Sequence, residues 1–569
     1  MGIFFKQLHK EDPAQMKREL KWLASRSKRY WKQILLIGTL SLLGTVMGLG
    51  GSVASKYAVD AITQRDGKML VVAGIAVAVM MLANILLQSA SSRVNARVHI
   101  KVSQKNQRMT YDRILHAGWE ALEPYRSGDL LHRMSADVNI VSGGIIGFPP
   151  SFLTTCVRLV GALAIILFFD PMMALIALLG VPATLVFSQA LVKLMRRHEL
   201  RMKELGGELM SFQADSFRNL TSIKAFFIAD RFNRDMHELQ DEYADAYLDA
   251  NATQIRISVI TALLSALLVG LCCCWCVYQM WFGSMSFGDL TMFLQLMTVL
   301  RGTFSSLLSM VKQSVSITTS AGRIMAVEEL PAENTMIPEG LTEEQGLSVK
   351  LEQVSFSYQD GDTVLHPFDF TANDGDIIAI TGPSGEGKTT LLRLLLGLVL
   401  PCSGSAALTG KTGKEYPIMA GTRCAFAYVP QGNSVFAGTV AQNLRLVNPE
   451  ATDEELRQAL EVACAWDFVQ QLPNGLEHML GAGGRGISEG QAQRLAIARA
   501  LLRKAPILLL DEATSAMDVA MEGKLLKNLR KSGLVHTCIL VTHRPGSTQF
   551  CNRTYEIRDG IVNEVRHGA

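Results

Sequence analysis

Six long apolar stretches dominate the first 320 residues, and they limit the folds open to this chain more than any other feature. Each is close to the roughly 20 residues that a helix needs to cross a bilayer. None contains an aspartate or a glutamate. The sequence therefore predicts a membrane bundle of six helices, over residues 32–54, 69–91, 145–169, 172–192, 257–281 and 290–311.

The connectors between these stretches alternate between short and long. The two long ones, 92–144 and 193–256, are charged and contain a single proline, Pro124. We therefore expect helical hairpins that extend well beyond the bilayer, at about 1.5 Å per residue. The basic N-terminal segment and the even number of spans place both termini and these hairpins in the cytosol. A basic, aromatic-rich helix over 16–31 is expected to lie in the membrane interface, with a solvated basic helix as the alternative.

The composition changes near Glu328, where Pro331 and Pro338 mark a linker. From Leu347 onward, short β-like runs alternate with helical runs, which is typical of a soluble α/β domain. The predicted organisation is an N-terminal segment (1–31), a six-helix membrane domain with two long cytosolic loops (32–325), a linker (326–346) and a C-terminal α/β domain (347–569).

Charge and cysteine content exclude some functions. The chain has 55 basic and 52 acidic side chains, a formal net charge of +3. This near-neutral balance argues against a nucleic-acid partner. Four of the ten cysteines crowd into one apolar run, Cys272, Cys273, Cys274 and Cys276. They favour packing as small hydrophobes over metal binding or redox chemistry.

The first motif of the C-terminal domain that indicates ligand binding is a glycine-rich loop. It runs from Gly382 to Thr389, after a strand-like run and before a helix-like run. Its backbone N–H groups and the N-terminus of the following helix are suited to bind phosphate. Lys388 is expected to reach the terminal phosphates, and Thr389 is expected to ligate Mg²⁺. The alternative is a plain glycine-rich turn. The candidate ATP-binding residues here are Gly382, Ser384, Gly385, Glu386, Gly387, Lys388, Thr389 and Thr390.

A second motif is the aliphatic run Ile507–Leu510 followed by two carboxylates. Four aliphatic residues predict a buried parallel strand, and ligands bind at the carboxyl ends of such strands. Asp511 is expected to hold Mg²⁺, and Glu512 to polarise the attacking water.

A third motif, Ser488-Glu489-Gly490-Gln491, precedes a helix-like run and is suited to an anion at a helix N-terminus. It resembles the LSGGQ signature of ATP-binding cassette (ABC) proteins. The resemblance implies that Ser488, Gly490 and Gln491 bind the ATP held by a partner cassette.

The resemblance also assigns roles elsewhere. Tyr358 resembles the aromatic that stacks on adenine, and Gln431 the glutamine that senses Mg²⁺. Residues 515–518 resemble the loop between two cassettes, and His543 the switch histidine on the γ-phosphate. The implied catalytic set is Glu512, His543 and Gln431, and the implied metal ligands are Thr389, Gln431 and Asp511.

Six spans with two long hairpins before one cassette resemble the ABC exporter family. The implied fold is the six-span bundle of the type I exporter (type IV ABC fold), joined to an α/β P-loop NTPase cassette. Residues 128–137 and 215–226 resemble the two cytosolic coupling regions that press on the cassette. Glu489 departs from the family pattern, because it stands where the first signature glycine is expected.

The resemblance implies a bacterial half-transporter of the cell membrane that hydrolyses Mg-ATP and exports a peptide, lipid or drug-like solute. One cassette cannot enclose ATP alone, so a second ABC half is expected, in a homodimer or a heterodimer. The alternative is an asymmetric or regulatory half of a heterodimer whose partner site is impaired. A channel built on the same fold stays open, whereas a soluble ABC ATPase is excluded by the six spans.

Two arginines interrupt the predicted spans. Arg158 lies midway in the third span and Arg301 near the middle of the sixth. Charges inside a membrane are functional by default. We expect these two to face the central cavity and favour an anionic or carbonyl-rich substrate, with bonding to backbone carbonyls or snorkelling as the alternative.

Overall fold

The computed structural model describes residues 13–125, 127–177, 201, 205–206, 208–217, 219–283, 285–344, 346–358, 361, 363–432, 434–481 and 484–565. The chain divides into two compact units. We call them the helical unit (Met1–Asp112 and Ser127–Glu329) and the cassette unit (Arg113–Arg126 and Leu330–Ala569).

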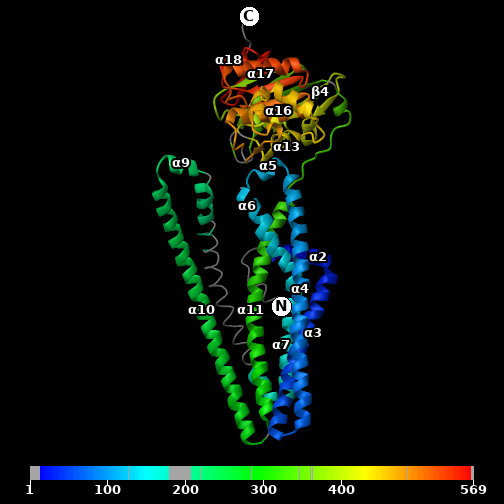
Figure 1. The fold of residues 1–569 in the computed structure, drawn as a ribbon, viewed down its shortest axis with the longest axis vertical. Coiled ribbons are helices and arrows are strands. Elements are labelled where there is room, and N and C mark those ends of the chain that lie inside the picture. Colours follow the sequence, from blue (N-terminus) through cyan, green and yellow to red (C-terminus); the bar gives the residue numbers. More distant parts are fainter. Residues whose placement is uncertain are drawn as a thin grey trace. The chain divides into compact units, whose positions relative to one another are not determined.

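The helical unit consists of long helices (Figure 1). Its described elements are α2 (Pro13–Lys28), α3 (Trp31–Gln64), α4 (Gly67–Leu115), α6 (Ser127–His132), the π-helical turn η1 (Arg133–Asp137), α7 (Val138–Phe169), α9 (Leu220–Ala225), α10 (Ala229–Trp281) and α11 (Phe287–Glu328).

Within the described residues, three helical stretches are long and apolar enough to cross a membrane: Trp31–Gln64, Gly67–Leu115 and Gly128–Phe169. They contain the first three predicted spans. The fifth lies in α10, whose end Ala266–Trp281 is a shorter apolar helix, and the sixth lies in α11. The fourth predicted span, 172–192, falls largely outside the described residues.

The helices α3, α7 and α11 pack around two groups of buried side chains. One includes Leu49, Ile166 and Phe293, and the other includes Val138 and Ile324. Burial of apolar area does not itself favour helix association in lipid, so close packing must hold these helices together.

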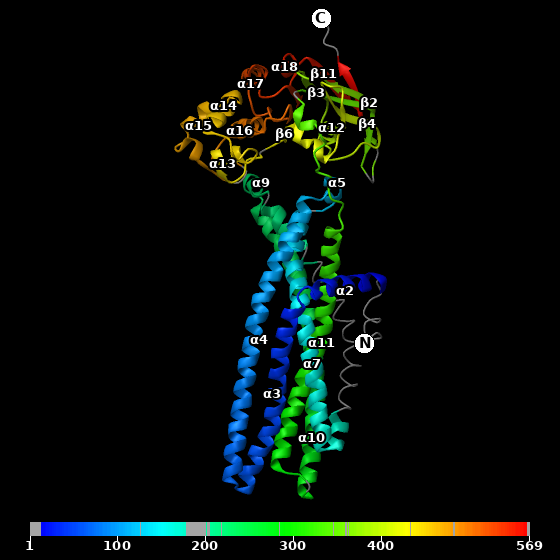
Figure 2. The same ribbon diagram turned by 90° about the vertical axis from the view of Figure 1, so that its right-hand side faces the viewer.

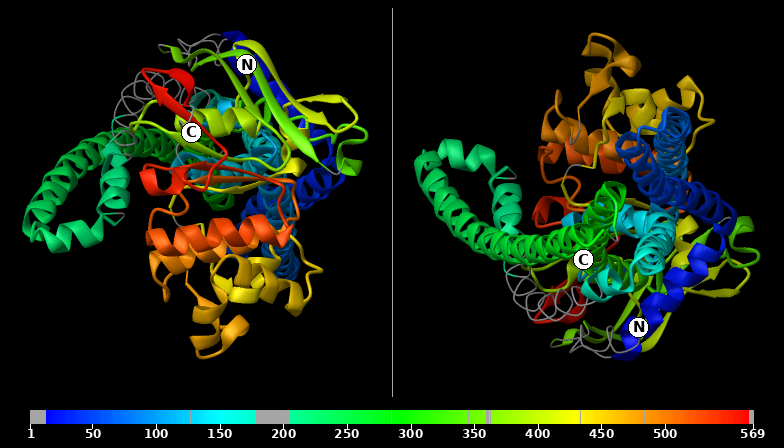
Figure 3. Two further views of the ribbon diagram at one scale, coloured as in Figure 1. Left: turned by 90° about the horizontal axis from the view of Figure 1, so that it is seen from above. Right: turned by 90° about the horizontal axis from the view of Figure 1, so that it is seen from below.

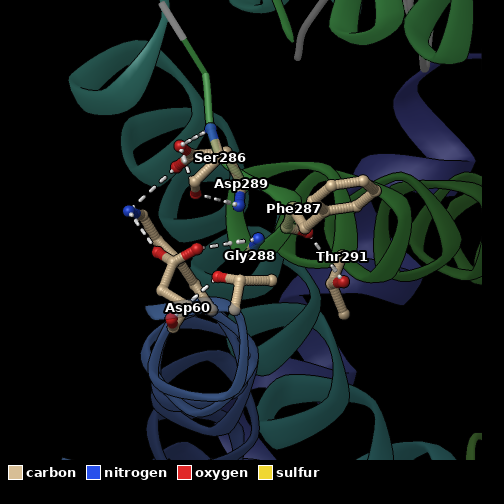
Figure 4. A network of polar contacts seen from close by, with 8 residues as sticks. Asp60, Ser286, Phe287, Gly288, Asp289 and Thr291 are labelled. Carbon is tan, nitrogen blue, oxygen red and sulfur yellow. Dashed lines mark hydrogen bonds and ion pairs between the residues drawn. The ribbon is translucent and has the colours of Figure 1, made fainter. Parts of the chain in front are cut away.

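A polar network joins α3 to the first turn of α11 (Figure 4). The Ser286 hydroxyl caps α11 by accepting from the Asp289 N–H, at 3.1 Å. Lys56 bridges two carboxylates, with 3.3 Å to Asp60 and 3.0 Å to Asp289. Asp60 in turn accepts the Gly288 N–H at 3.0 Å. All three charged side chains are at most 16% exposed, so each charge is compensated by its neighbours.

Helix α2 lies across the long helices rather than along them (Figures 2 and 3). Arg26 pairs with Glu328 at 2.5 Å, and the Trp22 indole N–H donates to the same carboxylate at 3.3 Å. Arg18 pairs with Glu329 at 2.7 Å. The N-terminal helix therefore holds the end of α11. Its place in a membrane interface stays a prediction.

The cassette unit contains three sheets. A six-stranded sheet has the order β12-β11-β3-β10-β9-β6. Neighbouring strands are parallel, except that β12 is antiparallel to β11. A four-stranded antiparallel sheet has the order β2-β1-β4-β5, and β7 pairs with β8. Two clusters of buried aliphatic and aromatic side chains fill the cassette around these sheets.

The strands are β1 (Leu347–Ser357), β2 (Thr363–Ala372), β3 (Ile377–Thr381), β4 (Ser403–Gly410), β5 (Glu415–Pro417), β6 (Phe426–Val429), β7 (Gly438–Thr439), β8 (Met479–Leu480), β9 (Ile507–Asp511), β10 (Thr537–Val541), β11 (Arg553–Arg558) and β12 (Ile561–Val565). The helices are α5 (Trp119–Leu122), α12 (Lys388–Leu395), α13 (Val440–Arg445), α14 (Asp453–Val462), α15 (Trp466–Gln471), α16 (Glu489–Leu502), α17 (Val519–Ser532) and α18 (Pro545–Thr548), with short 3-10 turns η2 (Leu341–Glu343), η3 (Ala420–Ala425) and η4 (Gly475–Glu477).

The segment Arg113–Arg126, although it follows α4, belongs to the cassette unit. It pairs with the linker through an antiparallel bridge between Ala117 and Ala332. The Gly118 N–H donates to the Pro331 carbonyl at 2.9 Å, and the Glu333 N–H donates to the His116 carbonyl at 2.9 Å. Helix α5 follows this bridge directly.

Residues 128–137, which resemble the first coupling region, lie in the helical unit, and their role in coupling stays a prediction. Asp129 and Asp137 both pair with Arg323 of α11, at 2.7 Å and 3.1 Å. Arg133 also donates to the Arg323 carbonyl at 2.9 Å. The short helix that packs in the cassette unit is α5, a few residues earlier in the chain.

Candidate nucleotide site

The glycine-rich loop lies between β3 and α12. Gly382, Gly385 and Gly387 have φ values of 141°, 90° and 101°, which favour glycine. A Cβ at Gly382 would also collide with the Ile557 carbonyl oxygen. The remaining predicted loop residues are in place here or in the first turn of α12: Ser384, Glu386, Lys388, Thr389 and Thr390.

The Lys388 ammonium lies inside this loop and donates to the carbonyls of Gly382 and Pro383, at 2.8 Å and 2.6 Å. Burial lowers the pKa of Lys388, while the nearby carboxylates of Glu512 and Asp511 oppose that shift. The amine thus already occupies the place where a phosphate at the start of α12 would meet it. The orphan N–H groups of the first helical turn face the same ligand, so the residues present fit a nucleotide triphosphate.

Asp511 ends β9 and is buried. The Tyr428 hydroxyl donates to its carboxylate at 3.2 Å. Burial raises the pKa of Asp511, and hydrogen bonds from Tyr428 and Thr389 partly offset that rise. The Asp511 carboxylate and the Thr389 hydroxyl beside it are oxygen donors of the kind that Mg²⁺ prefers.

Glu512 contacts the other two predicted catalytic residues. Its carboxylate accepts from the Gln431 amide at 2.7 Å and lies 2.9 Å from Nε2 of His543. Its φ is 49°, a conformation that side chains other than glycine rarely adopt. Such backbone strain at the end of a central strand is typical of functional sites. Residues predicted from three separate motifs therefore form one hydrogen-bonded cluster.

Strand order explains why this cluster forms. β10 lies between β3 and β9, and β6 borders β9 on the other side. These four strands are parallel, so their carboxyl ends meet at one edge. The glycine-rich loop, Gln431 and His543 follow β3, β6 and β10, and Asp511 is the last residue of β9.

The signature turn begins α16. Ser488 caps this helix by accepting from the Gln491 N–H at 3.3 Å, and the Gln491 side chain accepts from the Ser488 N–H at 2.8 Å. A Cβ at Gly490 would lie 2.8 Å from the Ala516 carbonyl oxygen, so this position requires glycine. Glu489 is exposed, which explains why the departure from the family pattern leaves the turn intact.

Two residues of the site were not predicted from the sequence. Tyr428, whose hydroxyl donates to Asp511, lies three residues before Gln431. Arg393, in the last turn of α12, donates to the Tyr358 hydroxyl at 2.8 Å. Neither carries a motif of its own, and each meets its partner only through the fold.

The predicted substrate arginines belong to the helical unit. Arg158 is half-buried in α7, and Arg301 is exposed in α11. Among the described residues neither makes a hydrogen bond or an ion pair. In the cysteine run of α10, Cys272 and Cys276 are buried, and the described residues contain no group of three or more histidine, cysteine, aspartate or glutamate side chains that could hold a metal ion.

Comparisons with known proteins match both parts of the chain. The family described as ABC transporter transmembrane region matches residues 34–304, and the family described as ABC transporter matches residues 365–515. Together the two matches span well over half of the chain. The chain belongs to the ABC transporters. It is a multi-pass membrane half-transporter with one cassette, and its activity is ATP hydrolysis coupled to transport.

Relatives of this ABC transporter come from several organisms. A putative export ATP-binding/permease protein of Rickettsia bellii is 27% identical and covers 96% of this chain and 96% of its own length. The mitochondrial iron-sulfur clusters transporter ATM1 of Kluyveromyces lactis is 31% identical over 62% of this chain and 50% of that protein. A multidrug resistance ABC transporter of Lactococcus lactis is 26% identical, over 79% and 76% of the two chains.

The fold has a close match among solved structures. A bacterial Atm1-family ABC exporter with ATP bound aligns with a TM-score of 0.81, at 23% identity, over 97% of this chain and 95% of that chain. The predicted fold class, a helical membrane domain fused to an α/β cassette, is confirmed. So is the prediction that the chain binds ATP and needs a second half.

Proposed function

We propose that this half-transporter exports a peptide, a lipid or a drug-like solute from the cytosol by alternating access. Two halves would enclose ATP between the Lys388 loop of one and the Ser488 turn of the other. We place the cassette and both termini in the cytosol of a bacterial cell. The Rickettsia bellii relative is named a putative export protein, and this name and the fusion of spans and cassette in one chain support export as the direction of transport.

The observation that carries the proposal is the contact of Glu512 with Gln431 and His543. In this arrangement the Glu512 carboxylate is positioned to orient a water and accept its proton. His543 and Gln431 hold that carboxylate from both sides. Lys388 and the N–H groups of the loop would balance the charge on the terminal phosphates.

Mg²⁺, when bound, would neutralise part of the phosphate charge. Thr389, Asp511 and Gln431 are the residues that would hold it. Tyr358 would stack on the adenine, and Ser488, Gly490 and Gln491 would contact the nucleotide of the other half.

The test is ATP turnover by the purified protein in lipid, with Glu512→Gln as the variant. We expect turnover to fall at least about a hundred-fold, because the proton acceptor is lost, while ATP binding persists. Lys388→Ala should instead weaken ATP binding itself. Unchanged turnover in Glu512→Gln would contradict the assignment of this carboxylate.

For the substrate, we propose an anionic or carbonyl-rich solute that meets Arg158 and Arg301. The support is that these two membrane arginines are not hydrogen-bonded within the described part of the chain. The test uses an Arg158→Gln, Arg301→Gln double variant and compares the stimulation of ATPase by an acidic peptide, an anionic lipid and a cationic drug. Stimulation by the two anionic compounds should be lost selectively, whereas Arg65→Gln, at the exposed end of α3, should behave as the wild type. Equal stimulation in the double variant would rule the idea out.

A second candidate is an asymmetric or regulatory half of a heterodimer. The observation that favours it is Glu489, which adds a negative charge at the helix terminus that would face the partner's ATP. Intact Glu512 and His543 would then make this chain's own nucleotide the hydrolysed one.

A further inference from the structure

Arg393 occupies a junction inside the cassette unit. It lies in the last turn of α12, the helix that begins at Lys388. One guanidinium nitrogen donates to the Tyr358 hydroxyl at 2.8 Å and lies 3.3 Å from the Glu123 carboxylate. The guanidinium also faces the Trp119 ring, 5.8 Å from its centroid. Arg393 thus contacts Tyr358, the proposed adenine aromatic, and also the first residue of α5 and the residue just after α5.

A second arginine fixes the same segment differently. Arg423 forms a two-pronged pair with Glu333 of the linker, one prong at 2.9 Å. It also donates to the Leu396 and Gly397 carbonyls, both at 2.8 Å. The Glu333 N–H donates to the His116 carbonyl, so Arg423 anchors both the linker and the start of the segment Arg113–Arg126 to the cassette core. None of these groups belongs to the nucleotide site, so this anchor is independent of ATP.

Tyr358 is partly buried, and its side chain packs against the core of the cassette unit. Its ring packs edge-on against Phe356, with centroids 4.8 Å apart. Its hydroxyl is bonded to Arg393. The perpendicular packing against Phe356 and the hydroxyl bond to Arg393 together fix the direction of the ring. Anything that moves the guanidinium therefore moves the surface on which the base would stack.

We propose that Arg393 is a positioning residue that couples occupancy of the adenine site to docking of α5. The inference rests on the proposed function, because Tyr358 must contact the base. A group that binds both partners in one geometry makes their free energies interdependent, and the dependence is reciprocal. A change in α5 that never touches the nucleotide must then alter the affinity for ATP.

The experiment is a double-mutant cycle on nucleotide affinity in the full-length protein, with Glu123→Gln, Arg393→Gln and the double variant. Affinities for ATP and for inorganic tripolyphosphate are measured by competition with a fluorescent nucleotide. Because the Arg393–Glu123 pair is partly exposed, we expect Glu123→Gln to weaken ATP binding about two- to five-fold. The same change in the Arg393→Gln background should have no further effect. Tripolyphosphate, which has no base, should bind all variants equally.

Controls separate positioning from folding. Tyr358→Phe keeps the ring and removes the hydroxyl, so it should reproduce the loss of ATP affinity seen in Arg393→Gln. Arg457→Gln breaks an exposed pair with Glu461 at 2.9 Å elsewhere on the cassette and should change nothing. Additive effects in the cycle, or equal losses for ATP and tripolyphosphate, would overturn the proposal. Failure of the wild type to bind ATP, or of Lys388→Ala to weaken both ligands, would instead overturn the proposed function.

Discussion

Asp511 is buried beside a second carboxylate, and its charge is only partly compensated by the Tyr428 and Thr389 hydroxyls. We predict that Asp511→Asn abolishes ATP turnover but stabilises the nucleotide-free protein, by about 0.5–2 kcal/mol, as is common when a strained functional group is removed. Burial raises the pKa of Asp511, which means that the charged carboxylate destabilises the folded protein. This destabilisation is fully present above the raised pKa and disappears at low pH, where the group is protonated.

The stabilising effect should therefore be largest at neutral pH and shrink as the pH falls through that pKa. Thermal unfolding without nucleotide, at pH 7 and at pH 5, checks this. Asp467→Asn, an exposed position in α15, serves as the control. A destabilised Asp511→Asn protein at pH 7 would contradict the prediction.

Much of the nucleotide site could be predicted residue by residue, because each motif directly follows a central strand. Lys388, Asp511 and His543 need only a parallel strand before them to arrive at the same edge of the sheet. Tyr428 and Arg393 could not be predicted in this way, since their partners Asp511 and Tyr358 are distant in sequence. Only the strand order and the packing of α12 bring these pairs together.

At the scale of elements, the contact of α3 with α11 depends on one glycine. A Cβ at Gly288 would collide with the Lys56 carbonyl oxygen and the Asp60 carboxylate. We predict that Gly288→Ala destabilises the helical unit by about 1–3 kcal/mol, because the added carbon forces the two helices apart and breaks the Asp60 bond.

Unfolding of the protein in detergent, followed by tryptophan fluorescence, measures this effect. The matched control is Gly302→Ala, in the same helix, where an added Cβ meets nothing within 4 Å. It should be neutral or stabilising by up to about 1 kcal/mol, since alanine favours helix. Equal stability of the two variants would show that the contact between the helices tolerates the extra carbon.

The sequence predicted that helices extend beyond the spans, but it did not predict that Arg113–Arg126 belongs to the cassette unit. Residues 92–144 have a continuous helix-compatible composition, and the resemblance pointed to 128–137. The available signals for the true break were Gly118 and Pro124, on either side of α5. A single glycine or proline does not by itself predict that a segment changes unit, because that depends on its pairing with the linker.

At the scale of the whole molecule, the proposed site needs two chains, since Lys388 and Ser488 of one cassette belong to different composite sites. We predict complementation between two inactive variants, Lys388→Ala and Ser488→Arg. In a symmetric pair, mixed dimers place both lesions in one site and leave the other intact, so an equal mixture recovers up to about a quarter of wild-type turnover.

ATPase assays of the separately purified variants and of the co-expressed mixture provide the measurement. Recovery supports a homodimer. If the wild-type chain alone hydrolyses ATP but the mixture stays inactive, shared sites are ruled out. A chain that is active only with a different half supports the asymmetric alternative raised by Glu489.

The bridge between Ala117 and Ala332 bears on how the cassette should be studied outside the membrane. A fragment that starts at Leu330 would lack Ala117, the bridge partner of Ala332. It would also lack Trp119 and Glu123, which contact Arg393. Its surface is completed by a peptide synthesised long before the cassette itself. Crystallisation or screening of the excised domain would therefore examine an incomplete body, unless residues 113–126 are grafted ahead of it or added as a separate peptide.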